Sequence, residues 1–185
     1  MEQLRFAIVP TALGAFGAVW SDAGIVRTWL HDRTPERTHR SITRAYPAAE
    51  EQTPPAAILE ALTGVGALLA GEPRSFIVDL DMHGIPEFDR RVYEVARTIP
   101  PGETITYGGI AKALGEEPMR ARDVGVALSR NPFAPIVPCH RVVAANGQLG
   151  GYSAPGGTST KRRLLELEGA AIVAPPLQAG LFDAL

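Results

Sequence analysis

A single cysteine, Cys139, lies in the segment Ile136-Val137-Pro138-Cys139-His140-Arg141-Val142, and the chain has no other cysteine. A thiolate is a strong nucleophile, and the histidine that follows is a side chain able to take up a proton near neutral pH. A lone cysteine is often only a small buried apolar residue. The Cys-His pair therefore indicates a candidate nucleophile, and its surroundings must decide between the two interpretations.

The path of the chain into Cys139 is set by three prolines, Pro132, Pro135 and Pro138. Proline fixes one backbone angle, so this segment should be extended. Asn131 comes directly before the first proline, and a residue in that position is pushed out of the helical region. Asn131 should therefore end a helix, and its amide could tie the turn to the cysteine loop. Ordinary asparagine turn chemistry is the alternative.

The segment before Asn131 has the pattern of a helix-turn-helix motif. Thr106 can cap a helix over residues 107–114, Gly115 turns the chain, and a second helix is expected from about 119 to 130. One face of the second helix is apolar and should be buried; it carries Ala121, Val124, Ala127 and Leu128.

The opposite face of that helix carries Arg122, Gly125, Val126 and Ser129. Its mostly small side chains would let a partner approach closely, and the arginine could reach into a groove or stack on bases. Residues 118–141 hold four arginines and one acid, so this stretch is +3 and the rest of the chain −5, given the net charge of −2. A local basic patch on an acidic protein can bind phosphates, although a solvated face is the alternative.

Composition and order of elements predict an α/β protein of 185 residues, 45% of them hydrophobic. Strands are expected at 4–9, 15–20, 25–30 and 76–80, with a helix over 54–70 and a polar, partly helical segment at 31–46. The domains expected are 1–84, 85–172 and a tail at 173–185. No membrane span or signal peptide is expected, and one free thiol suits the cytoplasm.

Residues 122–143 closely resemble the O6-alkylguanine-DNA alkyltransferases, also called methylated-DNA–protein-cysteine methyltransferases. The resemblance extends over about residues 86 to 169 and includes Ile99-Pro100-Pro101-Gly102-Glu103, Thr106-Tyr107, Gly151-Tyr152-Ser153 and the segment 161–169. It implies a ribonuclease H-like N-terminal domain, in which a small antiparallel sheet carries a helix. It also implies a mostly helical, winged-helix-like C-terminal domain.

The function that the resemblance implies is single-turnover repair of DNA. An alkylated guanine is flipped out of the duplex, and its alkyl group passes irreversibly from the O6 oxygen to Cys139. His140 would remove the thiol proton through a water, Glu168 would polarise the histidine, and Asn131 would be the hinge. The DNA contacts implied are Tyr107, Arg122, Gly125, Ser129 and Arg130. The alkylguanine pocket implied is lined by Tyr107, Leu128, Val142, Tyr152 and Ser153.

The expected partner is double-stranded DNA containing O6-alkylguanine, bound by a monomer without a cofactor or metal; activity on O4-alkylthymine stays open. Asp123 and Val126 depart from the family pattern on the second helix, although Arg120 could pair with Asp123. Two other functions compete with alkyl transfer. A lesion sensor that only binds DNA would lack the cysteine, and a cysteine hydrolase would need oxyanion-hole glycines before Cys139.

Overall fold

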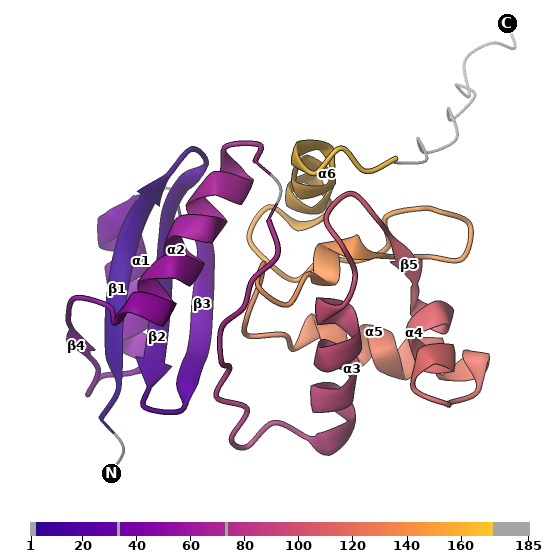
Figure 1. The fold of residues 1–185 in the computed structure, drawn as a ribbon, viewed down its shortest axis with the longest axis horizontal. Helices are drawn as coiled ribbons and strands as arrows, with labels where there is room; N and C mark the ends of the chain where they lie inside the picture. Colours follow the sequence, from indigo (N-terminus) through magenta and orange to yellow (C-terminus); the bar gives the residue numbers. More distant parts are fainter. Residues whose placement is uncertain (1–2, 33, 73, 172–185) are drawn as a thin grey trace, which may run out of the picture.

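The computed structural model describes residues 3–32, 34–72 and 74–171. It has a mixed α/β architecture, with a four-stranded sheet in the N-terminal half and most of the helices in the C-terminal half (Figure 1). The strands are β1 (Arg5–Thr11), β2 (Gly14–Ser21), β3 (Gly24–Asp32) and β4 (Glu50–Glu51). Their order is β3-β2-β1-β4, and the first three form the antiparallel meander that was predicted.

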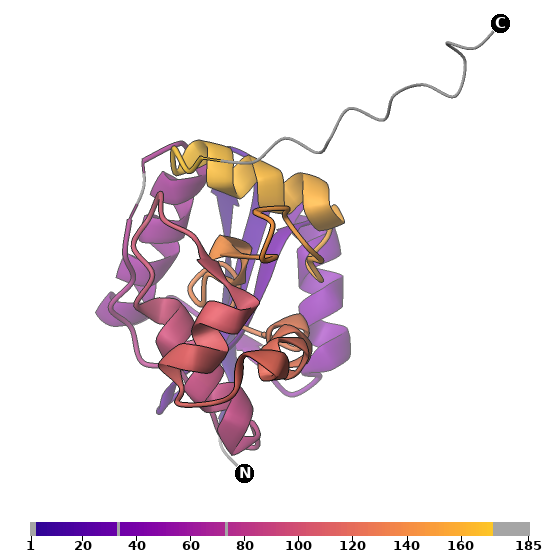
Figure 2. The same cartoon turned by 90° about the vertical axis from the view of Figure 1, so that its right-hand side faces the viewer.

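Two helices cover the two faces of this sheet, α1 (Pro35–Ala45) and α2 (Ala56–Leu69) (Figure 2). Phe6 and Val19 pack with Ile42 of α1, whereas Ala7 and Phe16 face the core that α2 completes. This division follows from the alternation of side chains along a strand, which sends successive residues to opposite faces. The core on the α2 side continues without a break into the C-terminal half.

The prediction of a strand at 76–80 is wrong. Only Leu80 forms a bridge, with Ile25, although the segment is extended. The carbonyl of Val78 accepts a hydrogen bond from the Arg97 guanidinium at 2.8 Å instead of pairing with a strand. The apolar residues that suggested a strand therefore lie in an extended connection between the two halves of the molecule.

The C-terminal half contains α3 (Glu87–Arg97), α4 (Tyr107–Ala113), α5 (Ala121–Ser129) and α6 (Gly157–Leu167). The helix-turn-helix prediction matches α4 and α5, which a 3₁₀ turn at Pro118–Arg120 connects. Thr106 caps α4 as expected, because its hydroxyl accepts from the Gly109 amide at 2.9 Å. A parallel pair of short strands, β5 (Ile105–Thr106) and β6 (Val142–Val143), was not predicted. No helix in the described ranges is long and apolar enough to cross a membrane.

Thr28 on β3 joins the two halves next to the cysteine loop. Its amide donates to the carbonyl of Pro132 at 2.8 Å, and its hydroxyl donates to the carbonyl of Ala134 at 2.6 Å. We expect Thr28→Val, which keeps the shape and removes the hydroxyl, to lower the free energy of unfolding by about 1 kcal/mol. Urea denaturation measures this loss. An unchanged midpoint would show that the hydroxyl hydrogen bond adds no stability beyond the backbone hydrogen bond of Thr28.

Candidate active site

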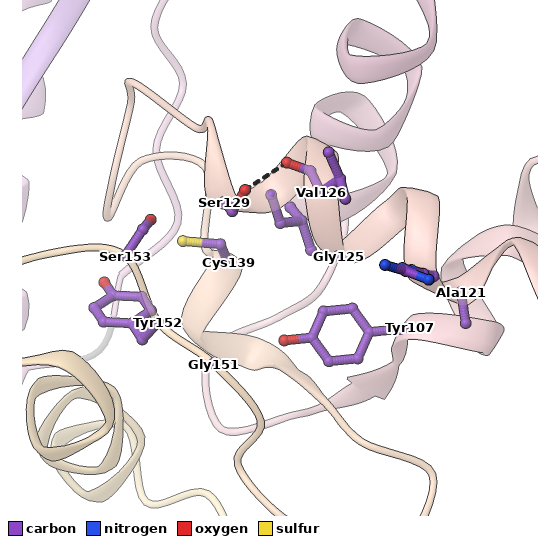
Figure 3. Close-up of a pocket in the computed structure, with 11 residues that line it drawn as sticks. Tyr107, Ala121, Gly125, Val126, Ser129, Cys139, Gly151, Tyr152 and Ser153 are labelled. Carbon is purple, nitrogen blue, oxygen red and sulfur yellow. Dashed lines mark hydrogen bonds between the residues drawn. The ribbon is translucent and has the colours of Figure 1, made fainter.

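A cavity of about 590 Å³ opens in the C-terminal half, and Cys139 lies in its wall (Figure 3). Helix α5 forms one side, and the segment 151–153 forms another. The lining residues are Tyr107, Ala121, Arg122, Gly125, Val126, Leu128, Ser129, Cys139, Gly151, Tyr152 and Ser153. The structure therefore brings together most of the residues that sequence reasoning assigned to the nucleophile, the recognition helix and the pocket.

Cys139 begins a 3₁₀ turn at Cys139–Arg141 and is 7% exposed. Asn131 fixes the loop before it, because its amide nitrogen donates to the Val137 carbonyl at 2.9 Å and its oxygen accepts from the Phe133 amide at 2.9 Å. Burial raises the pKa of the Cys139 thiol, while a hydrogen bond with Asn131 acts in the opposite direction. The resting side chain is thus a protonated thiol that needs a base.

His140 is fully buried and points away from solvent toward Glu168, with 2.9 Å between its Nε2 and the carboxylate Oε1. Burial lowers the pKa of His140, although the hydrogen bond to Glu168 opposes this shift. A neutral imidazole that donates from Nε2 has an acceptor at Nδ1. That Nδ1 atom is buried and has no hydrogen-bond partner within the described ranges. The ring is therefore set up to accept a proton at Nδ1.

Glu168 also accepts two hydrogen bonds from Arg141, whose Nε and Nη2 donate to the two carboxylate oxygens at 2.9 and 2.7 Å. Burial by itself would raise the pKa of Glu168, but the hydrogen bonds from His140 and Arg141 outweigh it and lower that pKa to about 2. Both ends of the ion pair are buried. Glu168 consequently has two roles, orienting His140 and neutralising a buried guanidinium.

Lys161 on α6 is a second buried cation near the cavity. Its ammonium donates to the carbonyls of Val142 and Gly151, and it lies 5.7 Å from the centre of the Tyr107 ring. Burial lowers the pKa of Lys161 to about 8. Lys161 therefore links the strand after the cysteine to the segment that carries Tyr152.

Two tyrosines flank Cys139 in the cavity, with the hydroxyl of Tyr107 pointing inward (Figure 3). Burial raises the pKa of Tyr107 and, more strongly, that of Tyr152, so both stay protonated at neutral pH. The Tyr152 hydroxyl is buried, and its interaction with the Cys139 thiol adds to the rise of its pKa. Gly150, at a φ of +67°, passes so close to Tyr107 that a Cβ there would come within 3.1 Å of its hydroxyl oxygen.

The basic patch predicted over residues 118–141 is largely neutralised. Arg141 is buried against Glu168, and Arg130 pairs with buried Asp89 at 3.0 Å. Arg120 binds Glu116 and also Asp123, the latter at 2.6 Å as predicted. Of the four arginines, Arg122 alone has no ion pair within the described ranges, and its exposed side chain lines the cavity. The apolar face of α5 is buried as expected at Val124, Ala127 and Leu128.

Of the five residues predicted to line the pocket, Val142 is the one outside the cavity lining. It is buried in β6, and its carbonyl binds Lys161. Arg130 is outside the lining as well. Sequence reasoning missed Lys161 and the buried position of Arg141. The spacing of Lys161, Leu164, Leu165 and Glu168 would have revealed Lys161, because these four positions share the buried side of one helix.

Comparison with known proteins agrees with this geometry. Residues 87–170 match the family model described as the DNA-binding domain of 6-O-methylguanine DNA methyltransferase. The methylated-DNA–protein-cysteine methyltransferase of Mycolicibacterium paratuberculosis is 48% identical over 168 residues, which cover 89% of this chain and 92% of the relative. The enzyme of the same name from Methanothermobacter thermautotrophicus is 37% identical, over 84% of this chain and 80% of its own.

Solved structures give the same result over the whole fold. The O6-methylguanine methyltransferase of Mycobacterium tuberculosis superposes with a TM-score of 0.70 at 35% identity, covering 94% of this chain and 97% of its own. The same protein in complex with DNA gives 0.70 at 36% identity, over 89% and 92% of the two chains. The chain belongs to the methylated-DNA–protein-cysteine methyltransferase family, as its sequence resemblance predicted.

Proposed function

We propose that this protein repairs alkylated DNA by direct reversal, through irreversible transfer of an alkyl group from the O6 oxygen of guanine to Cys139. The observation that supports this function most is the position of the thiol in the wall of a cavity, with a buried imidazole and carboxylate behind it. Family membership supports the same activity. The test is whether a labelled methyl group moves from O6-methylguanine DNA to the protein.

The chemistry needs one proton to leave the thiol and one to reach the base. His140, held by Glu168, would take the thiol proton through a water, and the sulfur would attack the alkyl carbon while the carbon–oxygen bond breaks. The departing guanine then needs a proton. The hydroxyls of Tyr107 and Tyr152 are both protonated donors that line the cavity. The product is a thioether, which has no route back to a thiol, so each molecule acts once.

The target base would enter the cavity by flipping out of the duplex, because the thiol is inaccessible to a stacked base. We propose that α5 lies in a groove of the DNA, where Gly125 and Ser129 permit close approach. Arg122 would fill the space of the flipped base, and Tyr107 would press on its phosphate. Arg130 remains a proposed phosphate contact, although its ion pair with Asp89 competes with that role.

Transfer is favoured over lesion sensing because the cavity wall contains a thiol. A cysteine hydrolase is not favoured, because no glycines that could form an oxyanion hole precede Cys139. We further propose a monomer in the cytoplasm, a ribonuclease H-like domain at 1–84 and a winged-helix-like domain at 85–172. The predicted tail at 173–185 lies outside the described residues.

Arg122→Ala should slow repair of O6-methylguanine in duplex DNA by about 10-fold or more, while transfer from free O6-benzylguanine stays near wild type. Flipping a paired base costs a few kcal/mol, which Arg122 would offset by taking the vacated place in the stack. A free base has no such cost. Single-turnover rates with both substrates measure the difference. Equal losses on the two substrates would place Arg122 in the fold or the pocket.

A further inference from the structure

A second cationic surface lies in the N-terminal half, away from Cys139. Here α1 and β3 enclose a cavity of about 480 Å³. We call it the arginine groove, and its lining residues are Arg27, Trp29, Arg37, Arg40, Ser41, Arg44 and Ala45. Four arginines thus line one depression of a chain whose net charge is −2.

The charges in the arginine groove are not neutralised within the described ranges. None of the four guanidinium groups has a carboxylate within salt-bridge distance there, in contrast to Arg120, Arg130 and Arg141. Arg40 acts electrostatically on Glu36, whose pKa is lowered mainly by a hydrogen bond from Thr34 and more weakly by Arg40. Four like charges repel one another, so an anionic partner would stabilise this surface.

The spacing of the arginines suits an extended polyanion. Arg37, Arg40 and Arg44 lie on one side of α1, and the first and last are about 10 Å apart along the helix. DNA presents a phosphate about every 3.4 Å along each strand, so this row spans several phosphates, more than one small anion offers. The guanidinium of Arg27 lies 5.3 Å from the Trp29 ring, which orients it beside the row.

The backbone at the β3 side of the groove is connected to the lesion pocket by a short path. Arg27 is adjacent to Thr28, whose amide binds the carbonyl of Pro132, and Pro132 comes three residues after Ser129 of the cavity wall. The reach of the chain puts the Cα atoms of Arg27 and Ser129 within about 20 Å of each other. One turn of duplex is about 34 Å long. In Figure 2, α5 lies nearer the viewer in the C-terminal half, and α1 lies behind it against the sheet.

We propose that the arginine groove binds the phosphate backbone of the same duplex, on one flank of the base that enters the Cys139 cavity. The inference rests on the proposed repair function and adds a contact by the N-terminal half. Exposed arginines on the N-terminal half would hold the flank without reading its sequence. The groove should therefore raise affinity and leave the chemistry unchanged.

The test compares Arg40→Gln and Arg44→Gln with Arg74→Gln. Arg74 is an exposed arginine that lines a different cavity, beside α2, so this control changes the net charge equally. The protein is titrated with fluorescent duplexes in which O6-methylguanine has an extension of about 10 base pairs on one flank or on the other. Each groove variant should bind one of these duplexes about five- to tenfold more weakly at 0.1 M salt, with the salt slope reduced by about 0.9.

The other duplex should bind every variant like wild type, and transfer from free O6-benzylguanine should not change. Equal losses on both flanks, a similar loss with Arg74→Gln, or no loss would overturn the proposal. So would a loss confined to the loading of several copies on long DNA, which would make the groove a contact between copies. Absence of methyl transfer by the wild-type protein is a separate result, which would refute the repair function while the affinities still judge the groove.

Discussion

Cys139→Ser is expected to remove alkyl transfer completely, with the fold and the affinity for lesion-containing DNA close to wild type. A serine hydroxyl is far less acidic than a thiol, so the His140–Glu168 pair cannot generate a comparable nucleophile from it. The side chain is nearly the same size, and the cavity wall should keep its shape. Gel detection of labelled methyl on the protein measures transfer, and fluorescence anisotropy measures binding.

Cys139→Ala serves as the matched control, since it removes the nucleophile without adding a hydroxyl. Both variants should trap the lesion as inactive complexes. Residual transfer by either variant would mean that a different residue accepts the alkyl group. Loss of binding by both would mean that the thiol supports the pocket itself.

Glu168→Gln is expected to have two effects, slower transfer by about 10²–10⁴-fold and a loss of about 3–5 kcal/mol of stability. The first effect follows from the hydrogen bond that sets the tautomer of His140. The second follows from Arg141, whose buried charge would lose its carboxylate. Single-turnover rates under conditions where the variant is folded, together with urea denaturation, separate the two effects.

Glu166→Gln is the control, because Glu166 lies two residues earlier and its exposed carboxylate pairs with the exposed Arg163. It should change neither rate nor stability by a measurable amount. Unchanged transfer by folded Glu168→Gln would refute the relay, and unchanged stability would refute the buried ion pair.

The free energy of unfolding should depend on pH in acid because of the same carboxylate, Glu168. The pKa of Glu168 is about 2 in the folded protein and higher in the unfolded chain, where 4.5 is the ordinary value. Its stabilisation is therefore complete above pH 4.5 and is lost as the pH falls toward 2. In Glu168→Gln this part of the acid dependence should disappear.

Local patterns predicted the fold well wherever a single element carries its own signal. The meander, the cap at Thr106 and the buried face of α5 all depend on neighbours in sequence. The prediction of a strand at 76–80 was wrong because β-forming residues occur in extended connections as well as in strands. In this segment the Val78 carbonyl accepts a hydrogen bond from Arg97. The β5–β6 pair joins residues nearly forty positions apart, which no local pattern encodes.

The candidate site was predicted from motifs, and its electrostatics were not. The number of arginines in residues 118–141 predicted a basic patch. In the structure Arg120, Arg130 and Arg141 form ion pairs, and Arg122 is left as the exposed charge at the cavity. Whether a charge is exposed depends on contacts between distant segments, such as Arg141 with Glu168. The arginine groove escaped notice for the same reason, because β3 and α1 combine to form it.

Single transfer to Cys139 is tested by the mass of the intact protein after incubation with excess duplex containing O6-methylguanine, followed by peptide mapping. We expect one added methyl group, about 14 Da, on Cys139 in every active molecule and no further change with time. Methyl on another residue, or repaired DNA in excess of protein, would contradict single transfer to Cys139.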